Sequence, residues 1–330
     1  PGRFGRTVTF RMPTREDRKD IADLYFSKKA HDPDLDSPAR RDEFARVTEG
    51  YSPAMLEQSL SLALMYAFED GRDRFNWRDL REAMGNIEAG LAEPVEYSER
   101  DKVGVARHEL GHAVAARFYL PEQASVRLSV RMRSGSLGHH RAVDKEERFT
   151  RFRSEEAGNL RHTLGAIASE RVFYNENSSG VSMDLVQATS LACHMIGVWG
   201  MGPDPLDPIL SIRATRMGQQ LISRAQSLSG VLEPGTLEGA VLSNPDSRKM
   251  VAQVMGAAFI DCWRLMYVNQ EGIDQAAEAL MAQGELIGDE ITGLLDSVNL
   301  RLPAEPDPFP QDFPEIPDLE AGRGLHVAGA

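Results

Sequence analysis

The stretch that decides the fold is residues 98–120, which have the sequence SERDKVGVARHELGHAVAARFYL. Ser98 followed by Asp101 is typical of a helix start, because a serine side chain there can accept a hydrogen bond from a free backbone amide. Apolar residues then recur with the 3.6-residue period of a helix that buries one face. They are Val103, Ala106, Leu110, Val114 and Phe118. We therefore expect one long helix across this stretch.

An HExxH motif lies in the middle of the expected helix, formed by His108, Glu109 and His112. Residues four apart lie on the same face of a helix, so both imidazoles can reach one metal ion. Zinc accepts imidazole nitrogens, and a glutamate beside the ion can hold a water molecule and take its proton. The pattern indicates a zinc-dependent hydrolase, although a chance match on a solvated helix face would have the same letters.

A catalytic zinc site needs a third protein ligand, and the residues alone leave its identity open. One class of zinc peptidases has a further histidine where this chain has Phe118, and another has a glutamate about 20 residues on, where it has Met132. Asp184 lies in the first turn of an expected helix, behind the small residues 177–181. A carboxylate is favoured at any helix start, so the residues alone favour interpreting Asp184 as an ordinary first-turn acid over a metal ligand.

The rest of the chain is predicted to be mostly helical. Thr14 and Asp17 form a capping box at the start of four helices that extend to residue 90. Alternating apolar and polar residues predict two strands within 124–143, around a turn at Ser134-Gly135. The proline- and glycine-rich residues 201–245 are left unassigned. The other expected segments are a linker at 91–97, a helix at 154–175, a helix capped by Ser182 that ends at Trp199, and two helices within 246–298 joined near Glu271-Gly272.

The composition is that of a globular protein with an acidic balance. The 330 residues carry 37 Lys and Arg against 50 Asp and Glu, a formal net charge of −13. We expect no nucleic-acid partner, because such a partner requires a basic face.

Cys193 and Cys262 lie in apolar runs and predict buried, reduced thiols, which suits the cytoplasm. No apolar run approaches the roughly 20 residues that cross a bilayer, and the start at Pro1 indicates a fragment.

Five motifs together resemble the C-terminal half of FtsH-type ATP-dependent zinc metalloproteases, the membrane-anchored AAA proteases. They follow the family's order along the chain and cover residues 1–202. The motifs are PGRFGR at 1–6, TEGYSPAMLEQSLSLALMYA at 48–67, RHELGHAVAARF at 107–118, GAIASERVFY at 165–174 and SSGVSMDLVQATSLACHMIGVWGMG at 178–202.

The resemblance implies a mainly α fold. A four-helix AAA lid domain is followed by a mostly helical, zincin-like peptidase domain with a small β element. The implied domains are a remnant of the AAA ATPase core at 1–12, the lid at 13–92, the peptidase domain at 93–300 and a disordered Pro-rich tail at 301–330.

The same resemblance implies the roles of the site residues. His108 and His112 match the family's zinc ligands, Asp184 matches the third ligand, and Glu109 matches the general base. Glu170 matches a family glutamate near the metal, and is either an alternative third ligand or a residue that supports the ligands. The implied activity is zinc-dependent endopeptidase hydrolysis of unfolded or membrane proteins by a zinc-activated water.

The resemblance also implies partners outside this chain. Arg3 and Arg6 match arginines that contact the nucleotide of a neighbouring subunit in a hexameric ring. No phosphate-binding GxxxxGK[ST] loop is present, so ATP is expected only with an upstream ATPase core. Membrane attachment is likewise expected only through an upstream segment, in a parent protein anchored in the membrane and facing the cytoplasm.

Two alternatives stay open at this point. The chain could be a catalytically inactive FtsH-like assembly module, or a stand-alone zinc peptidase of another class. Residues 136–140 occupy the place of a strand edge beside the family's active site, where an extended substrate could add by backbone pairing. His139 and His140 in this segment are either part of a second metal site or, as we expect, two exposed strand histidines.

Overall fold

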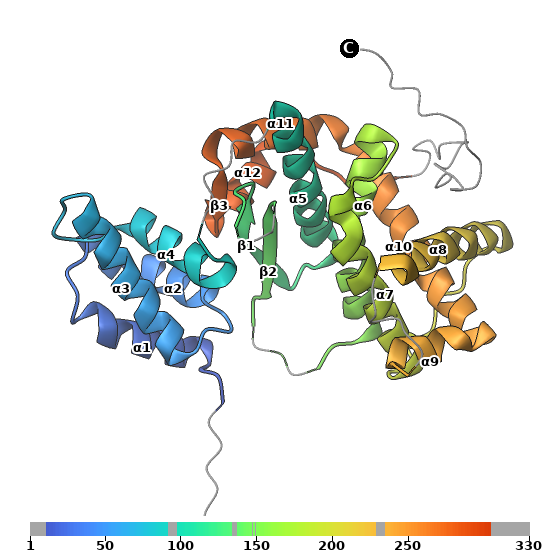
Figure 1. Ribbon diagram of the computed structural model, residues 1–330, viewed down its shortest axis with the longest axis horizontal. Coiled ribbons are helices and arrows are strands. Elements are labelled where there is room, and N and C mark those ends of the chain that lie inside the picture. The colour runs from blue at the N-terminus through green and yellow to red at the C-terminus, as the bar shows by residue number, and fades with distance from the viewer. Residues whose placement is uncertain are drawn as a thin grey trace, which may run out of the picture. The chain divides into compact units, whose positions relative to one another are not determined.

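The structure is a computed structural model, and it describes residues 11–91, 98–133, 137–146, 148, 150–228 and 235–304. The described residues are mainly helical and contain one small three-stranded sheet (Figure 1). The predicted mainly α fold with a small β element is therefore confirmed. No helix within the described ranges combines the length and the apolar character that a membrane span requires.

Several predictions fall on residues outside the described ranges. They concern Arg3 and Arg6, residues 1–10 of the expected ATPase remnant, residues 92–97 of the linker, the turn at 134–136 and the tail from residue 305 onward.

The chain divides into two compact units, and the HExxH helix crosses the boundary between them. The first unit consists of Pro1–Glu109, Pro121–Thr150 and Glu278–Ser297. The second consists of Leu110–Leu120, Arg151–Ala277 and Val298–Ala330. The domain boundaries predicted at 12, 92 and 300 stay predictions, because compactness alone does not define a domain.

The first unit begins with helices that the capping signals predict. The Thr14 hydroxyl accepts a hydrogen bond from Asp17 N, and the Asp17 carboxylate accepts one from Thr14 N. Phe26, Phe44 and Phe75 form the centre of the core, with ring centroids of Phe26 and Phe44 5.7 Å apart. The helices are α1 (Arg15–Phe26), α2 (Pro38–Val47), α3 (Pro53–Glu69) and α4 (Trp77–Ala89).

A three-stranded antiparallel sheet completes the first unit. Its strands β1 (Gln123–Ser129) and β2 (His139–Asp144) are those expected within 124–143. β3 (Glu285–Ile287) pairs with the other side of β1, so the order is β2-β1-β3 and β2 is an edge strand. α12 (Asp289–Ser297) follows β3. The sequence did not predict β3, because three residues are too few to show an alternating pattern.

The second unit is built from long helices. The helices are α6 (Arg153–Tyr174), α7 (Ser182–Gly197), α8 (Pro208–Leu228), α9 (Leu237–Ser243) and α10 (Pro245–Val268). α8 lies in the stretch that the sequence left unassigned. The two helices expected around a junction near Glu271-Gly272 are α10 and α11 (Gln270–Gln283), and their junction lies at Asn269, two residues earlier in the chain.

α8 and α10 approach each other closely at a reciprocal pair of small residues. A Cβ atom on Gly218 would collide with the backbone of Ala252, and one on Gly256 would collide with the backbone of Ala214. Each glycine therefore allows the backbone of the other helix to lie where a side chain would otherwise be.

Candidate metal centre

The HExxH motif lies on α5 (Glu99–Tyr119), the helix that its capping and periodicity predict (Figure 1). Ser98 Oγ accepts a hydrogen bond from Asp101 N at 3.1 Å, the expected N-terminal cap. Leu110, Val114 and other apolar residues of α5 are fully buried. Their burial fixes the rotation of the helix, and with it the direction in which the two histidines project.

α5 and α6 cross at a second pair of glycines. A Cβ on Gly111 would lie 2.7 Å from Gly165 O, and a Cβ on Gly165 would collide with Gly111 O. The close crossing brings the α6 backbone up to the motif, where His112 Nδ1 donates a hydrogen bond to His162 O at 2.9 Å. This bond leaves the lone pair of His112 on Nε2, the nitrogen that can bind a metal.

The structure brings His108, His112 and Asp184 together. Asp184 lies in the first turn of α7, and its Oδ2 is 3.5 Å from His112 Nε2. One ligand atom from each of the three residues can be chosen so that all three lie within 4.8 Å of one another. His112 and Asp184 both belong to the second unit, and His108 precedes His112 by one turn of the same helix.

Glu170 has a different position from these three residues. Its buried carboxylate, 4% exposed, accepts hydrogen bonds from Ser178 N at 2.6 Å and from Ser178 Oγ at 2.9 Å. Asn177 Nδ2 donates a third hydrogen bond at 3.3 Å. Glu170 therefore holds the turn that leads into α7, the helix that carries Asp184.

The start of α7 differs from the prediction at Ser182. This serine is the first helical residue rather than its cap, and its hydroxyl donates to Ser179 O at 2.8 Å. A short 3₁₀ helix, Ser179–Val181, precedes α7 and is capped by Ser178. The 3₁₀ turn takes the place of a side-chain cap because it continues directly into α7.

Glu109 lies against the segment that enters β2. Its side chain is largely buried, at 6% exposed. A Cβ on Gly138 would lie 2.6 Å from Glu109 Oε1 and 2.7 Å from Val105 Cγ1. The backbone at Gly138 therefore runs beside the carboxylate, and a side chain there would displace Glu109 or Val105. The residues alone do not predict this contact, because Gly138 is far from Glu109 along the chain, whereas the family resemblance places residues 136–140 at a strand edge beside the active site.

The other histidines near these elements have distinct surroundings. Burial, together with the neighbouring His112, lowers the pKa of His162 to about 3, so its ring is neutral. His139 and His140 are half-buried rather than exposed as expected, and His140 Nε2 lies 2.8 Å from Ser125 Oγ. Within the described residues, His108, His112 and Asp184 form the one cluster of potential metal ligands, so nothing supports a second site.

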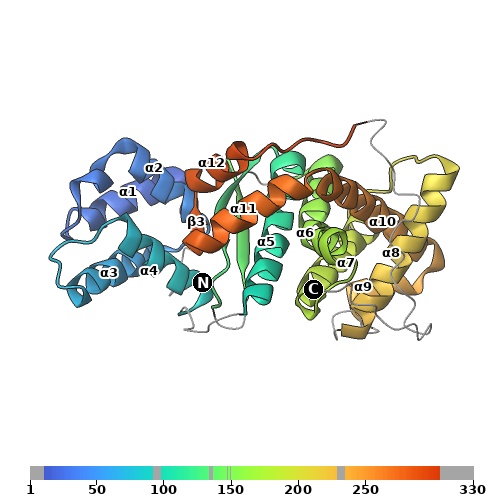
Figure 2. The same ribbon diagram turned by 90° about the horizontal axis from the view of Figure 1, so that it is seen from above.

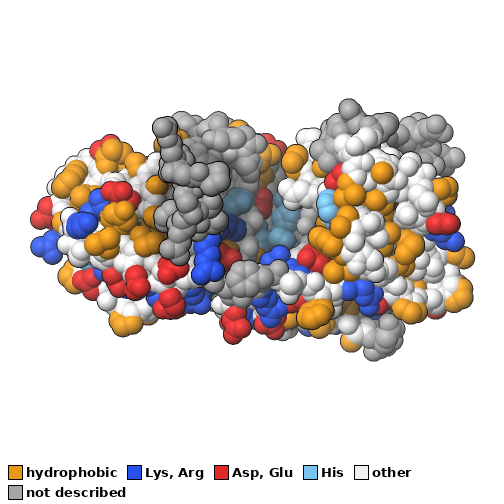
Figure 3. All heavy atoms as spheres, turned by 90° about the horizontal axis from the view of Figure 1, so that it is seen from below, with side chains coloured by type: hydrophobic (Ala, Val, Ile, Leu, Met, Phe, Trp, Pro, Cys, Tyr) orange, Lys and Arg blue, Asp and Glu red, His pale blue; other side chains and the backbone are white. Residues whose placement is uncertain are grey.

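Histidine side chains are visible on one face of the space-filling view (Figure 3). The side chains of His112 and Asp184 are 11% and 15% exposed, so a ligand could reach them. Two imidazole nitrogens and one carboxylate oxygen form a donor set that zinc accepts with an open fourth position. The hydrogen bond between His112 and a backbone carbonyl is the support that such ligands usually have. The residues present therefore fit a catalytic zinc ion.

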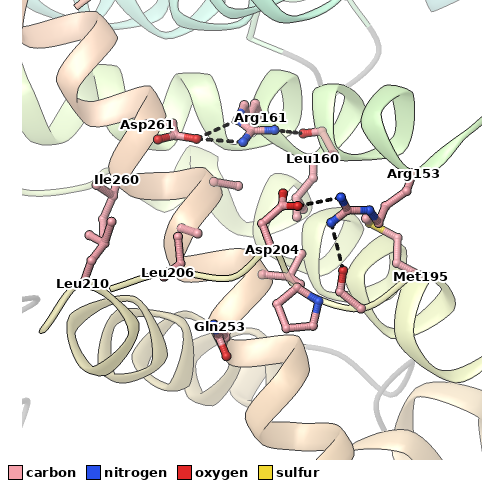
Figure 4. A pocket seen from close by; sticks show the side chains of 16 residues that line it. Arg153, Leu160, Arg161, Met195, Asp204, Leu206, Leu210, Gln253, Ile260 and Asp261 are labelled. Carbon is pink, nitrogen blue, oxygen red and sulfur yellow. Dashed lines mark hydrogen bonds and ion pairs between the residues drawn. The ribbon is translucent and has the colours of Figure 1, made fainter. Parts of the chain in front are cut away.

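A cavity of about 100 Å³ lies elsewhere in the second unit, between α6, α10 and the residues before α8 (Figure 4). Its walls are mostly apolar. Its two arginines are engaged in ion pairs, Arg153 with Asp204 at 2.5 Å and Arg161 with Asp261 at 2.7 Å. These pairs close the polar side of the cavity, which has no contact with the candidate metal ligands.

Comparison with known proteins identifies relatives of the chain. The model of Peptidase family M41 matches residues 95–294, more than half of the chain. An ATP-dependent zinc metalloprotease FtsH 4 of Sphaerobacter thermophilus is 30% identical over 89% of this chain. An FtsH 2 of Conexibacter woesei is 28% identical over 98%, and the YME1L protease of Drosophila melanogaster is 27% identical over 90%.

The chain covers only part of each of these relatives. The matched regions span 43%, 44% and 37% of the three relatives' own lengths. The chain therefore corresponds to about two fifths of each relative.

Proposed function

The chain belongs to peptidase family M41, and we propose that it is the peptidase part of a zinc-dependent, ATP-dependent protease. One observation carries the proposal. The ligand atoms of His108, His112 and Asp184 lie within 4.8 Å of one another, although Asp184 is far from the motif along the chain. An inactive assembly module would have no need to preserve this grouping.

Zinc is the proposed cofactor, with His108, His112 and Asp184 as its ligands. When bound, it would polarise a peptide carbonyl and lower the pKa of a coordinated water. The chain's own contribution is orientation: His162 O holds the His112 ring, and Glu170 holds the turn before Asp184. Glu170 is proposed as a supporting residue rather than a ligand, because Ser178 already engages both of its carboxylate oxygens.

Glu109 is the proposed general base. It follows His108 directly in the motif, and its carboxylate is shielded by the backbone at Gly138. It would take a proton from the attacking water and pass it to the leaving amine. A largely buried carboxylate suits this role because bulk water cannot compete for the proton.

The proposed substrates are extended or unfolded polypeptides. β2 is an edge strand, and among the described residues it pairs only with β1. A substrate strand could therefore pair with the outer edge of β2, which begins one residue after Gly138. This arrangement would bring a peptide bond toward Glu109.

The whole protein is proposed to work as a hexameric ring with an upstream ATPase core. Relatives of the chain are named ATP-dependent zinc metalloproteases, which supports this proposal. Arg3 and Arg6 would contact the nucleotide of a neighbouring subunit. The parent protein is proposed to be membrane-anchored through an upstream segment and to face the cytoplasm.

The test combines zinc content with hydrolysis of an unfolded substrate. We expect about one zinc per chain, and loss of peptidase activity by at least about 100-fold in Glu109→Gln, with zinc retained. Glu99→Gln is the matched control, because Glu99 lies at the exposed start of the same helix. Undiminished hydrolysis by Glu109→Gln would refute the assigned base. A purified chain that binds no zinc would instead indicate an inactive assembly module.

A further inference from the structure

The first unit contains a cluster of buried charges that the proposed chemistry does not use. Arg127 on β1 and Glu285 on β3 are each 4% exposed, and Arg133 is 3% exposed. Arg127 forms ion pairs at 2.8 Å with Glu285 and with Glu88 of α4. Charged side chains are rarely this deeply buried unless they are paired, so the cluster requires an explanation.

Glu88 is the residue on which the cluster converges. Its Oε2 lies 2.8 Å from Arg127 Nε. Its Oε1 accepts hydrogen bonds from Tyr51 OH at 2.9 Å and from Arg141 Nη1 at 2.7 Å. Burial and the neighbouring Glu88 carboxylate raise the pKa of Tyr51, so this hydroxyl stays protonated and continues to donate. One carboxylate of α4 thus holds side chains from both β1 and β2.

The cluster joins the N-terminal helices to the sheet. Arg141 of β2 also donates to Val47 O at 3.2 Å and to Glu49 O, at the end of α2. At Gly85 of α4, a Cβ would lie 2.8 Å from Arg133 Nη2 and 3.0 Å from Arg127 Nη1. The arginines of the sheet therefore lie directly against the backbone of α4.

Further contacts at the rim of the same junction are exposed. Arg46 of α2 pairs with Asp289 of α12 at 2.8 Å, with the Asp289 side chain 79% exposed. Figure 2 shows α12 and β3 beside the α1–α4 helices, within the first unit. The rim and the centre of the junction thus carry the same kind of ion pair, one in water and the other buried.

This junction reaches the candidate active site through β2. Arg141 lies three residues after Gly138, whose backbone runs against Glu109 Oε1. Displacement of Arg141 would move the strand that leaves Gly138, and with it the edge available for substrate pairing. The charge that holds Arg141 and Arg127 comes from Glu88, which lies in the N-terminal helices.

We propose that Glu88 is a positioning residue, which holds the edge strand β2 beside Glu109 through Arg141 and Arg127 and so couples the N-terminal helices to substrate binding. Its role in substrate binding rests on the proposed peptidase function, whereas its role in holding β2 does not. Replacement of Glu88 by a neutral residue would leave Arg127 with the Glu285 carboxylate as its partner and would remove the carboxylate that pairs with the partly buried Arg141. Among the described residues β2 pairs only with β1, and Arg141 is the β2 residue that contacts Glu88 and the end of α2, so we expect loss of Glu88 to loosen β2.

The experiment compares Glu88→Gln with Asp289→Asn in the zinc-loaded full chain. Each change removes one carboxylate charge from the same junction, but Asp289 is exposed and pairs with Arg46 of α2 rather than with an arginine of the sheet. Amide hydrogen exchange in β2 should become about tenfold faster in Glu88→Gln and stay unchanged in Asp289→Asn. Exchange in α6 and α7 and zinc content should be unchanged in both variants.

Peptide hydrolysis supplies the readout that a general loss of stability would not change. We expect the KM of Glu88→Gln to rise about fivefold with kcat within about twofold of wild type, because the substrate edge moves while zinc and Glu109 remain. If Glu88→Gln does not fold, Arg141→Lys replaces it. This variant keeps the charge beside Glu88 but cannot also reach Val47 O and Glu49 O.

Equal exchange in β2 for the wild type and a folded Glu88→Gln would overturn the proposal. A rise in exchange of the same size in Asp289→Asn would also overturn it, because any charge loss at the junction would then suffice. If the wild type hydrolyses no polypeptide, the peptidase function fails. The exchange result then decides separately whether Glu88 holds β2.

Discussion

The two units are held together internally by opposite means. In the first unit, buried arginines and carboxylates join helices to a sheet, with Glu88 paired to Arg127 and Arg141. In the second unit, α8 and α10 touch backbone to backbone at Gly218 and Gly256. The first arrangement depends on charge, so it should be most sensitive to mutations that remove a buried charge. The second depends on volume and is insensitive to charge.

This difference has a consequence for how the site is built. The histidine and aspartate cluster depends on close helix packing, because the Gly111–Gly165 crossing brings α6 to α5. The strand beside Glu109 depends on the charged junction instead. The arrangement of the candidate metal ligands should therefore be sensitive to mutations that add volume between helices. The position of the strand beside Glu109 should be sensitive to mutations that remove charge.

The largest effect on stability is expected from loss of the central charge. Glu88→Gln should lower the free energy of unfolding by about 3 kcal/mol, because it removes the carboxylate that pairs with both the buried Arg127 and the partly buried Arg141. Asp289→Asn, at the exposed rim, should lower it by less than about 0.5 kcal/mol. Urea unfolding of the two variants measures both values. Equal losses would show that the junction is not organised around buried charge.

A smaller but more local effect is expected from a single methyl group in the second unit. Gly218→Ala should lower the free energy of unfolding by about 2 kcal/mol, since the added Cβ collides with the Ala252 backbone and α8 must move away from α10. Gly293→Ala is the matched control in α12, where a Cβ meets open space, and it should raise stability by about 0.5 kcal/mol. Thermal and urea unfolding distinguish the two. A neutral Gly218→Ala would mean that the helices are not in tight contact.

The smallest effect is expected from titration of His139 in the charged junction. Burial, with Arg127 and Arg141 nearby, lowers its pKa, although Glu88 and Glu285 oppose the shift. The unfolded chain therefore binds a proton more readily than the folded one, and stability should be complete above pH of about 6.5 and decline as the pH falls below it.

His139→Gln should make that decline shallower without abolishing it. His162 in the second unit, with a pKa of about 3, adds a loss of its own over the same range. Urea unfolding at a series of pH values between neutral and mildly acid measures the slope. An unchanged slope in His139→Gln would show that this histidine is equally easy to protonate in both states.

Much of the local structure could be predicted from the sequence. The capping box at Thr14 and Asp17, the helix of the HExxH motif and the two strands within 124–143 each depend on residues close together in the chain. α8 could not be predicted in the same way. Its turn-forming surroundings hide it, and Ile209 and Ile212 are exposed, which blurs its apolar face.

The candidate site also contains one part that could be predicted from the sequence and one part that could not. The residues determine that His108 and His112 share a helix face, because a helix repeats every 3.6 residues whatever surrounds it. The residues alone left the third ligand open, and family resemblance supplied Asp184. Its place beside His112 depends on the turn that Glu170 holds and on the packing of α7 near α5, two helices that are far apart along the chain.

The sequence by itself determined most of the helices outside residues 201–245, two of the strands and the pair of histidines, because capping and hydrophobic period act over one or two turns of chain. Only the tertiary structure decided which groups lie beside them. The carbonyl of His162 that orients His112, the backbone at Gly138 beside Glu109, and the burial of Arg127 between Glu88 and Glu285 are such contacts. Each joins residues far apart along the chain, and their proximity follows from how whole helices and strands pack.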